Sequence, residues 1–276
     1  MAVFTLSDEE FWLISGLVHA KFGIRLTEKK RNLVVGRLQK LLLAKGFKSF
    51  KDYYEYVVAD TTGRALLEMI DRISTNHTYF FREKVHFEFL TDKVLPALAQ
   101  KLACQGAGEI RIWCAGCSSG EEPYSAAMAF NEWKSSSGAN VGAAILATDI
   151  STSALEKARS GIYQEESMQG VPAPYRLRYF VPRGGGRWQV VDEIREMVLF
   201  RRLNLMRTEY PFRRKFHVIF CRNVMIYFDL PTQRALVERF YRYTETGGYL
   251  FVGHSETLGR FGGPFVYVKP SIYRKG

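Results

Sequence analysis

A glycine-containing loop follows an apolar segment near the middle of the chain. Ile110–Ala115 is followed by Gly116-Cys117-Ser118-Ser119-Gly120 and then by two carboxylates, Glu121 and Glu122. Glycine lets the backbone turn sharply and approach a ligand closely. The G-x-x-x-G spacing differs from the dinucleotide fingerprint, and the carboxylates would repel a pyrophosphate. The loop therefore favours a ligand with a cationic amino-acid group, although a tight structural turn explains it equally well when the loop is taken alone.

Two further apolar segments also end in polar residues. Ala144–Asp149 ends in a carboxylate that could accept hydrogen bonds from a ribose diol. The same Asp149 could instead cap a following helix. Val218–Arg222 continues into Asn223 and the aromatic-containing run Val224–Phe228, which suits a ligand with a charged head and an apolar flank. Taken singly, each of these last residues would more often pack in a core.

The elements that must position these residues alternate along most of the chain. The predicted strands are Ile110–Ala115, Ala144–Asp149, Val198–Arg202, Val218–Arg222 and Tyr249–Gly253, and the predicted helices are Val85–Leu102, Tyr124–Trp133, Ser153–Ser160 and Thr232–Tyr243. Short apolar strands with helical connections predict an α/β protein with a doubly wound parallel sheet. Val266–Val268 and Ser271–Arg274 would add a hairpin to that sheet.

The beginning of the chain and one long connection depart from this alternation. Ser7 with Glu10 forms a capping box, and Thr27 and Gly46 are expected to begin and end a second helix. We therefore expect a small helical domain over residues 1–72 and an α/β domain over 73–276. The connection after Asp149 is too long for a simple crossover. Its Gly184-Gly185-Gly186 turn between two apolar runs predicts a small antiparallel β insertion at about 163–197.

A mixed polar and aromatic segment, Ser74–Glu83, joins the two expected domains. Ligand sites are often found at such junctions, so the segment is a further candidate. His77, taken alone, is given no catalytic role.

Composition and charge narrow the class of protein. The chain has 276 residues and a formal net charge of +11, so it attracts polyanions or acidic protein surfaces, nucleic acid included. No apolar run approaches the ~18–20 residues that span a bilayer, and no secretion signal begins the chain, which favours a cytoplasmic protein. Cys114 and Cys117 form a lone C-x-x-C without the partners of a zinc site, so we expect packed thiols and no metal.

The positive charge is concentrated in the expected second helix. On a helical wheel over Thr27–Lys45, the apolar residues gather on one side and four cations on the other, namely Lys29, Lys30, Arg37 and Lys40. A solvated face is the simpler explanation. Acids are nearly absent from the segment, however, which favours an acidic partner.

Six blocks of sequence together resemble the CheR-type chemotaxis protein methyltransferases. They are Thr75–Arg82, Gly120–Ser125, Ala147–Ile150, Lys157–Tyr163, Cys221–Phe228 and Gly253–Glu256, in this order and over nearly the whole chain. The resemblance implies S-adenosylmethionine as cofactor and S-adenosylhomocysteine as product. It also implies a helical domain, a methyltransferase domain and a β-subdomain, and O-methylation of glutamate side chains of a chemoreceptor.

The resemblance also assigns roles to individual residues. Cofactor contacts are implied for Asn76, Thr78, Arg82, Glu122, Asp149, Asn204, Leu205, Arg222 and Asn223. Tyr227 matches a tyrosine beside the transferred methyl group, and Arg82 would hold a carboxylate, so these two are the catalytic candidates. Lys29, Lys30, Arg37 and Lys40 would dock on the acidic methylated helices of the receptor.

Partners and competing functions follow from the same comparison. In some members the β-subdomain holds a peptide at the receptor's C-terminus. Here the turn Pro182–Trp188 looks shorter, which argues against such a tether. We expect a monomer without membrane insertion, recruited to receptor arrays at the inner face of the membrane. A nucleic-acid methyltransferase would need an N-P-P-[YF] run where Arg222-Asn223-Val224-Met225 stands. A non-catalytic cofactor-binding adaptor is the other alternative.

Overall fold

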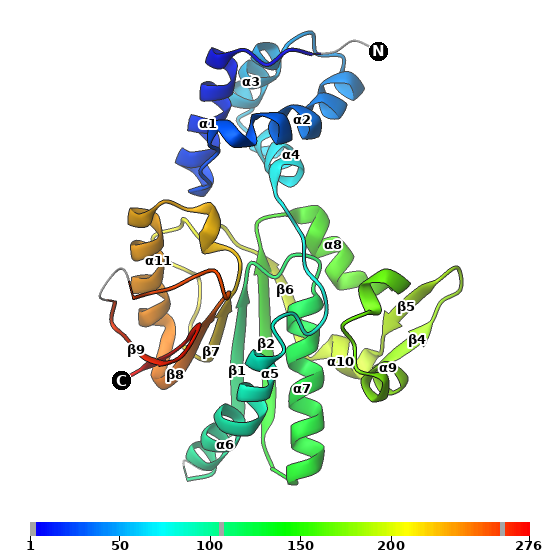
Figure 1. Cartoon of the computed structure of the whole chain (residues 1–276), viewed down its shortest axis with the longest axis vertical. Coiled ribbons are helices and arrows are strands. Elements are labelled where there is room, and N and C mark those ends of the chain that lie inside the picture. Colours follow the sequence, from blue (N-terminus) through cyan, green and yellow to red (C-terminus); the bar gives the residue numbers. More distant parts are fainter. Residues whose placement is uncertain (1–3, 105–107, 260–262) are drawn as a thin grey trace.

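The chain forms a helical bundle that lies over one end of an α/β layer structure (Figure 1). The structure is a computed structural model that describes residues 4–104, 108–259 and 263–276. A linker after the last bundle helix runs down into the α/β part. Among the described residues, every helix is too short or too polar to cross a bilayer.

The helical part contains α1 (Asp8–Phe22), α2 (Arg31–Lys45), α3 (Phe50–Ala59) and α4 (Arg64–Ile73). Its core includes Phe11, Val34, Leu38, Phe50 and Met69, all fully buried. The predicted capping box is confirmed, because Ser7 Oγ accepts a hydrogen bond from the Glu10 amide and Glu10 Oε2 accepts one from the Ser7 amide. Gly46 ends α2 in the left-handed conformation, as predicted.

The start of the second helix was predicted wrongly. Thr27 makes no capping hydrogen bond, and a 3-10 turn, Glu28–Lys30, precedes α2. The Arg31 guanidinium tightens this turn, since it bonds Glu28 Oε1 at 2.6 Å and Asp8 Oδ1 at 2.7 Å. Lys29 and Lys30 therefore lie on a tight turn, off the regular face of the helix.

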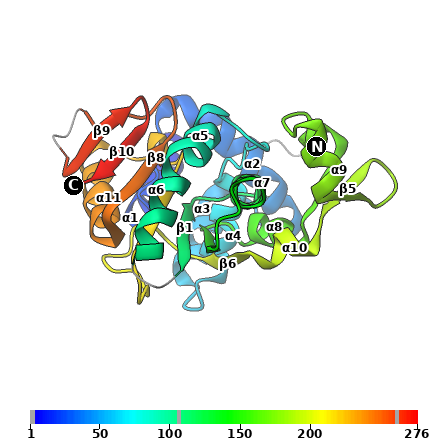
Figure 2. The same ribbon diagram turned by 90° about the horizontal axis from the view of Figure 1, so that it is seen from below.

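The α/β part is built on a mixed sheet of seven strands in the order β6-β2-β1-β7-β8-β10-β9. The strands are β1 (Glu109–Ala115), β2 (Gly142–Asp149), β6 (Val198–Arg202), β7 (Phe216–Cys221), β8 (Thr244–Val252), β9 (Phe265–Lys269) and β10 (Ile272–Lys275). The first five in sequence pair in parallel, and β10 pairs antiparallel with both β8 and β9. The terminal hairpin thus completes the sheet, as predicted, and makes it mixed. Figure 2 shows this hairpin at one end of the sheet.

Helices cover both faces of the sheet, which confirms the doubly wound arrangement. They are α5 (Val85–Phe89), α6 (Leu95–Cys104), α7 (Glu121–Ser137), α8 (Thr152–Ser160) and α11 (Leu230–Tyr243). Alternate residues of β1 enter opposite cores. Ile112 packs with the side chains of α6 and α7, whereas Trp113 packs with those of α11. A π-helical turn, Leu90–Val94, joins α5 to α6, so the single predicted helix is continuous but not regular.

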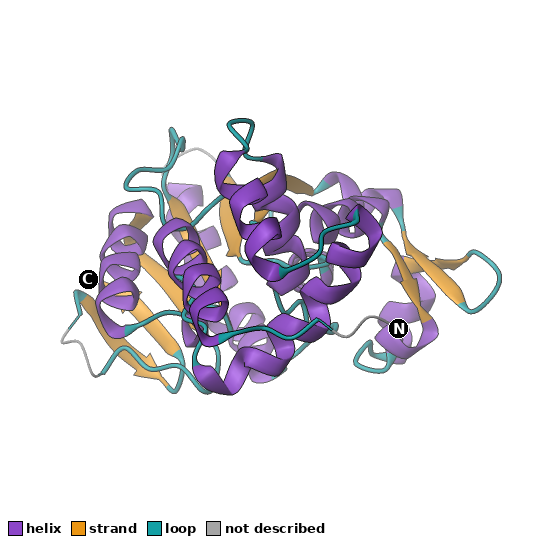
Figure 3. Ribbon diagram, turned by 90° about the horizontal axis from the view of Figure 1, so that it is seen from above, coloured by secondary structure: helices purple, strands orange, loops and turns teal. Residues whose placement is uncertain are grey.

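The predicted insertion forms a separate sheet in the order β3-β5-β4. Its strands are β3 (Ile162–Gln164), β4 (Phe180–Pro182) and β5 (Arg187–Val190), and it projects from the side opposite the C-terminus (Figure 3). Gly184, Gly185 and Gly186 all have positive φ, so this turn needs glycine. The insertion also holds two short helices that the sequence pattern did not predict, α9 (Ala173–Tyr179) and α10 (Asp192–Glu196).

Candidate active site

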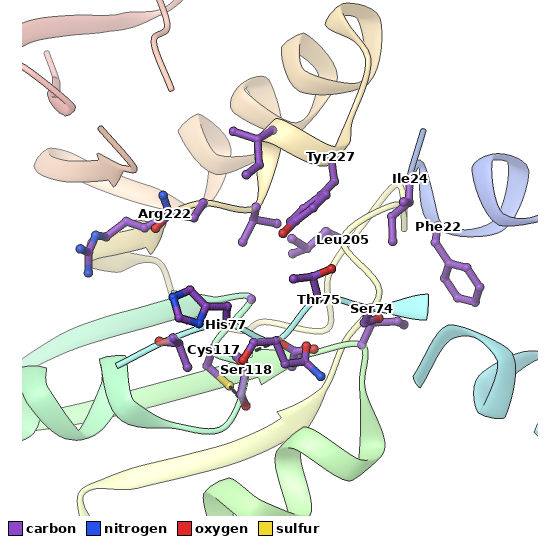
Figure 4. Close-up of a pocket in the computed structure, with 18 of the residues that line it drawn as sticks. Phe22, Ile24, Ser74, Thr75, His77, Cys117, Ser118, Leu205, Arg222 and Tyr227 are labelled. Carbon is purple, nitrogen blue, oxygen red and sulfur yellow. Dashed lines mark hydrogen bonds between the residues drawn. The ribbon is translucent and has the colours of Figure 1, made fainter. Parts of the chain in front are cut away.

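A cavity of about 350 Å³ lies where the helical part meets the carboxyl ends of the parallel strands (Figure 4). Residues from several regions line it. The end of α1 and the turn before α2 contribute Phe22, Ile24, Leu26 and Lys30. The linker after α4 contributes Ser74–Tyr79 and Arg82, and the strand ends contribute Gly116–Ser118, Asp149, Arg222 and Asn223. Leu203–Leu205 and Ile226–Phe228 complete the wall.

The loop between β1 and α7 bends sharply into this cavity. Gly116, Ser118 and Gly120 have φ values of 83°, 50° and 96°. A Cβ atom at Gly116 would collide with Val224, and one at Gly120 would lie 2.8 Å from the Cβ atom of Ala158. The two glycines therefore allow close packing against Val224 and α8 as well as chain reversal. The helix begins at Glu121, earlier than predicted, so both carboxylates fall in its first turn.

Asp149 ends β2 inside the cavity. Its carboxylate accepts hydrogen bonds from the amides of Ser118 at 2.7 Å and Ser151 at 2.9 Å. Burial raises the pKa of this carboxyl group. The capping alternative is wrong, because Ser151 is the residue whose side chain caps α8. Asp149 instead fixes the Gly116–Gly120 loop and directs a carboxylate at the cavity.

Buried charges form a second feature of the cavity. Arg222 Nη1 lies 3.0 Å from Glu122 Oε2, and Arg222 Nη2 lies 3.1 Å from Glu83 Oε2. Only 2% of the Arg222 side chain is exposed. Burial raises the pKa of Glu122, against the pull of Arg222. Arg222 thus bridges two carboxylates, one of which faces the cavity.

The loop that carries Tyr227 is held from both domains. Glu256 accepts hydrogen bonds from the amides of Asn223 at 2.8 Å and Ile226 at 3.2 Å. Asn223 is left-handed, with φ of 59°. From the helical part, Ile24 forms a β-bridge with Phe228, next to Tyr227. In Figure 4 the Tyr227 ring points from this loop towards Leu205.

The linker contributes residues that are more exposed. Arg82 Nη1 donates to the carbonyl of His77 at 3.0 Å, and its guanidinium lies 5.7 Å from the Tyr79 ring centroid. The carbonyl of Asn76 accepts a hydrogen bond from Ser118 Oγ at 3.2 Å, which ties the linker to the β1–α7 loop. Thr78 lies between Asn76 and Arg82 in the sequence and is half-buried at the cavity wall.

Asn204 and Leu205 lie after β6, below the helical part. Asn204 Nδ2 donates to the carbonyl of Lys21 at 2.8 Å, and Asn204 Oδ1 accepts from the amide of Met206 at 2.9 Å. The Asn204 amide therefore spans the two domains. Leu205 presents an apolar surface to the cavity.

The structure brings every residue predicted for cofactor binding or catalysis to one cavity, namely Asn76, Thr78, Arg82, Glu122, Asp149, Asn204, Leu205, Arg222, Asn223 and Tyr227. Sequence patterns missed Ser118, Glu83 and Glu256, which hold these residues in place. Glu83 stood beside Arg82 in the junction segment, but nothing local indicated its partner.

The four predicted docking cations do not share one face. Lys29 and Lys40 are exposed. Lys30 lies at the cavity, with Nζ 4.9 Å from the centroid of the Tyr227 ring, and burial lowers its pKa. Arg37 is half-buried, and its Nη1 donates to the carbonyl of Ile73 at 3.0 Å and to that of Ser74. Arg37 therefore fixes the end of α4 and the start of the linker.

Cys114 and Cys117 are packed thiols, as expected, whereas Cys104 is exposed. All four are free, and Cys114, Cys117 and Cys221 are buried. Burial raises the pKa of each of these three thiols well above its ordinary value, so they are poor nucleophiles.

This sheet order, with a cavity at the carboxyl ends of the strands and an acid ending β2, defines an S-adenosylmethionine-dependent methyltransferase. The donor set fits that cofactor. A carboxylate suits a ribose diol, Glu122 suits an ammonium group, and apolar residues such as Leu205 suit a nucleobase.

Comparison with known proteins identifies the family within this class of methyltransferases. Residues 76–273 match the family described as "CheR methyltransferase, SAM binding domain", and residues 9–74 match "CheR methyltransferase, all-alpha domain". The chain belongs to the CheR methyltransferase family.

Relatives in several bacteria cover nearly the whole chain. A chemotaxis protein methyltransferase of Borreliella burgdorferi is 45% identical over 98% of this chain and 95% of its own. Chemotaxis protein methyltransferase 1 of Pseudomonas aeruginosa is 38% identical over 97% and 98%. The chemotaxis protein methyltransferase of Escherichia coli is 36% identical over 97% and 91%.

Proposed function

We propose that this methyltransferase transfers the methyl group of S-adenosylmethionine to glutamate side chains of a methyl-accepting chemotaxis receptor. The main support for an acidic acceptor is the position of Lys30 at the cavity, where its Nζ lies 4.9 Å from the centroid of the Tyr227 ring. A half-buried ammonium group beside the catalytic candidate favours an acidic acceptor. The names of the relatives support a substrate in the chemotaxis system.

In this proposal, different cavity residues bind different parts of the cofactor. Asp149 binds the ribose, while Asn204 and Leu205 flank the adenine. Glu122, Arg222 and Asn223 face the methionine portion from the sheet, and Asn76, Thr78 and Arg82 face it from the linker. All of them line the one cavity, which is the physical support for the assignment.

Little acid–base chemistry is needed for this transfer. The cofactor supplies an electrophilic methyl group on a sulfonium, whose leaving thioether is neutral. A glutamate acceptor is already ionised at neutral pH, so no strong base is required. Positioning can then supply most of the rate, since effective molarities are worth roughly 7–11 kcal/mol. Arg82 would hold a carboxylate of cofactor or substrate through its fork, and Tyr227 would shield the sulfonium and orient the acceptor oxygen.

The helical domain, residues 1–72, is proposed to dock the receptor, and residues 73–276 to carry out the reaction. Lys29 lies in the same turn as Lys30, Lys40 lies on α2, and both are exposed. An acidic receptor helix is proposed to contact these two cations while one glutamate reaches the cavity beside Lys30. Arg37 would act from within this surface, through the end of α4. We expect the enzyme to act as a cytoplasmic monomer at receptor arrays, without a receptor C-terminal tether.

A transfer assay with tritiated methyl cofactor tests the proposal. Purified enzyme is incubated separately with receptor-containing membranes and with RNA. Base-labile label on the receptor, formed more slowly when Tyr227→Phe or Arg82→Ala replaces the wild type, supports glutamate esters. Label on RNA would support a nucleic-acid methyltransferase, and cofactor binding without label on either would support an adaptor.

A further inference from the structure

Behind Glu122 lies a carboxylate that the cavity itself does not contain. Glu83 accepts hydrogen bonds from Arg222 Nε at 3.3 Å and from Arg222 Nη2 at 3.1 Å, while Arg222 Nη1 reaches Glu122 at 3.0 Å. Exposed fractions are 11% for the Glu83 side chain and 12% for that of Glu122. The three groups therefore form a row of carboxylate, guanidinium and carboxylate, of which Arg222 and Glu122 line the cavity and Glu83 does not.

The charges of this row do not cancel. Two carboxylates and one guanidinium leave one negative charge. Burial by itself would raise the pKa of Glu83, but Arg222 and the hydrogen bond from the His254 amide together outweigh burial, and the net shift of the pKa is downward. Glu83 thus stays ionised and matches the charge of Arg222, so that the charge of Glu122 is left over for the cavity.

The backbone of Glu83 is also in an unfavourable conformation. Its φ of 56° is left-handed, which is unfavourable for glutamate. Its second oxygen, Oε1, accepts hydrogen bonds from the amide of His254 at 3.2 Å and from Asn223 Nδ2 at 3.4 Å. Glu83 therefore connects three segments that meet behind the cavity: the linker, the end of β7 and the end of β8.

A metal site is the competing explanation for this cluster. Glu83, His86 and His254 could each direct one ligand atom at a common point. His86 is fully buried, and both of its ring nitrogens lack a hydrogen-bond partner among the described residues. Arg222, however, already occupies Glu83 Oε2, and its positive charge would repel a divalent cation. Burial, followed by the charge of Arg222, lowers the pKa of His86 to about 3, so this histidine is neutral and leaves the charge count unchanged.

We propose that Glu83 is a positioning residue for cofactor binding: it binds Arg222 so that Glu122 presents a net negative charge to the ammonium group of the cofactor's methionine portion. The proposal rests on the proposed role of Glu122. Without Glu83, Arg222 and Glu122 would form a neutral pair, and the ammonium group would lose its counter-charge.

Two ligands and two variants test this inference. S-adenosylhomocysteine carries the ammonium group, whereas 5′-methylthioadenosine has the same nucleoside and thioether without the amino-acid portion. Calorimetry should show that Glu83→Gln weakens the binding of S-adenosylhomocysteine about tenfold or more, because one nearby charge is worth at least about one pKa unit. Binding of 5′-methylthioadenosine should stay within about twofold of wild type, which a misfolded variant would not achieve.

The reference variant is Glu122→Gln, which should show the same selective loss. The double variant should bind S-adenosylhomocysteine no more weakly than Glu122→Gln alone, since Glu83 acts through Glu122. Glu83→Asp, which keeps the charge, should restore part of the affinity. The positioning role is overturned if Glu122→Gln selectively loses affinity for S-adenosylhomocysteine and Glu83→Gln does not. It is also overturned if the losses of affinity in the two single variants add up in the double variant. No selective loss in Glu122→Gln overturns instead the assignment of Glu122 itself.

Discussion

The backbone amide of Arg25 donates a hydrogen bond of 2.8 Å to the carbonyl of Tyr227. Arg25 belongs to the segment after α1, and Tyr227 to the turn before α11. The neighbouring β-bridge between Ile24 and Phe228 strengthens the connection. The helical part therefore contacts the backbone of the catalytic candidate directly.

Removing the Tyr227 hydroxyl should slow methyl transfer while leaving the fold intact. We expect Tyr227→Phe to lower kcat about fivefold, because orientation of the acceptor oxygen by one hydrogen bond is worth about 1 kcal/mol. The stability change should stay within about 0.5 kcal/mol, since the side chain is only half-buried. Single-turnover transfer to receptor membranes and urea unfolding measure the two effects. Wild-type turnover in this variant would remove Tyr227 from the catalytic site.

Arg82 offers a test of the forked contact to a carboxylate. Its own protein contacts are few, namely the His77 carbonyl and the Tyr79 ring, so Arg82→Ala should unfold the protein little. We expect kcat/KM for the cofactor to fall about a hundredfold, and Arg82→Lys to recover only part of it, since lysine lacks the planar fork. Lys84→Ala, an exposed cation two residues away, is the matched control. Equal losses in Arg82→Ala and Lys84→Ala would point to a general charge effect.

Receptor docking through the exposed cations predicts a charge-reversal effect on one substrate only. Lys29→Glu with Lys40→Glu should raise KM for receptor membranes about tenfold and leave the affinity for S-adenosylhomocysteine unchanged, because both residues lie outside the cavity. The difference from wild type should shrink at high salt, where surface charges are screened. Lys134→Glu, near the far end of α7 and away from the cavity, is the control, and it changes the net charge half as much as the double variant does. A similar rise in KM for Lys134→Glu would argue for non-specific attraction to the membrane.

Local patterns predicted the architecture because each strand and helix carries its own periodicity. The residues at the strand ends could be found for the same reason: parallel strands bring their carboxyl ends to one edge, as Asp149 and Arg222 show. Connections between distant segments could not be found in this way. Glu83 and Arg222 are 139 positions apart, and neither residue's neighbours indicate the other.

The basic helix shows a second limit of periodicity. A helical wheel assumes a regular helix from Thr27, but the tight turn before Arg31 rotates Lys30 onto Tyr227. Arg37 keeps its predicted place on the helix, yet it donates to carbonyls at the end of α4. A wheel places a side chain around its own axis and cannot show which neighbouring element it will contact.

Asp229 provides a pH-dependent test of the join between the two domains. Its Oδ1 caps α11 by accepting from the Thr232 amide at 2.9 Å, and its Oδ2 lies 2.9 Å from His19 Nε2 on α1. The hydrogen bonds from Thr232, followed by that from His19, lower the pKa of Asp229 to about 2. A carboxyl group whose folded pKa is depressed stabilises the fold above its unfolded pKa, and this contribution is lost as pH falls towards the folded pKa.

We therefore expect Asp229→Ala to lower the free energy of unfolding by about 1–2 kcal/mol at pH 7, the usual cost of removing such a cap. The difference in free energy of unfolding between the variant and the wild type should narrow as the pH is lowered from about 4 towards 2, where the wild-type carboxylate takes up its proton. Urea unfolding of both proteins at a series of pH values measures this difference. Glu238→Ala, an exposed acid on the same helix, should show a small and nearly constant difference. A gap that stayed constant for Asp229→Ala down to pH 2 would mean that the carboxylate charge contributes nothing to the cap.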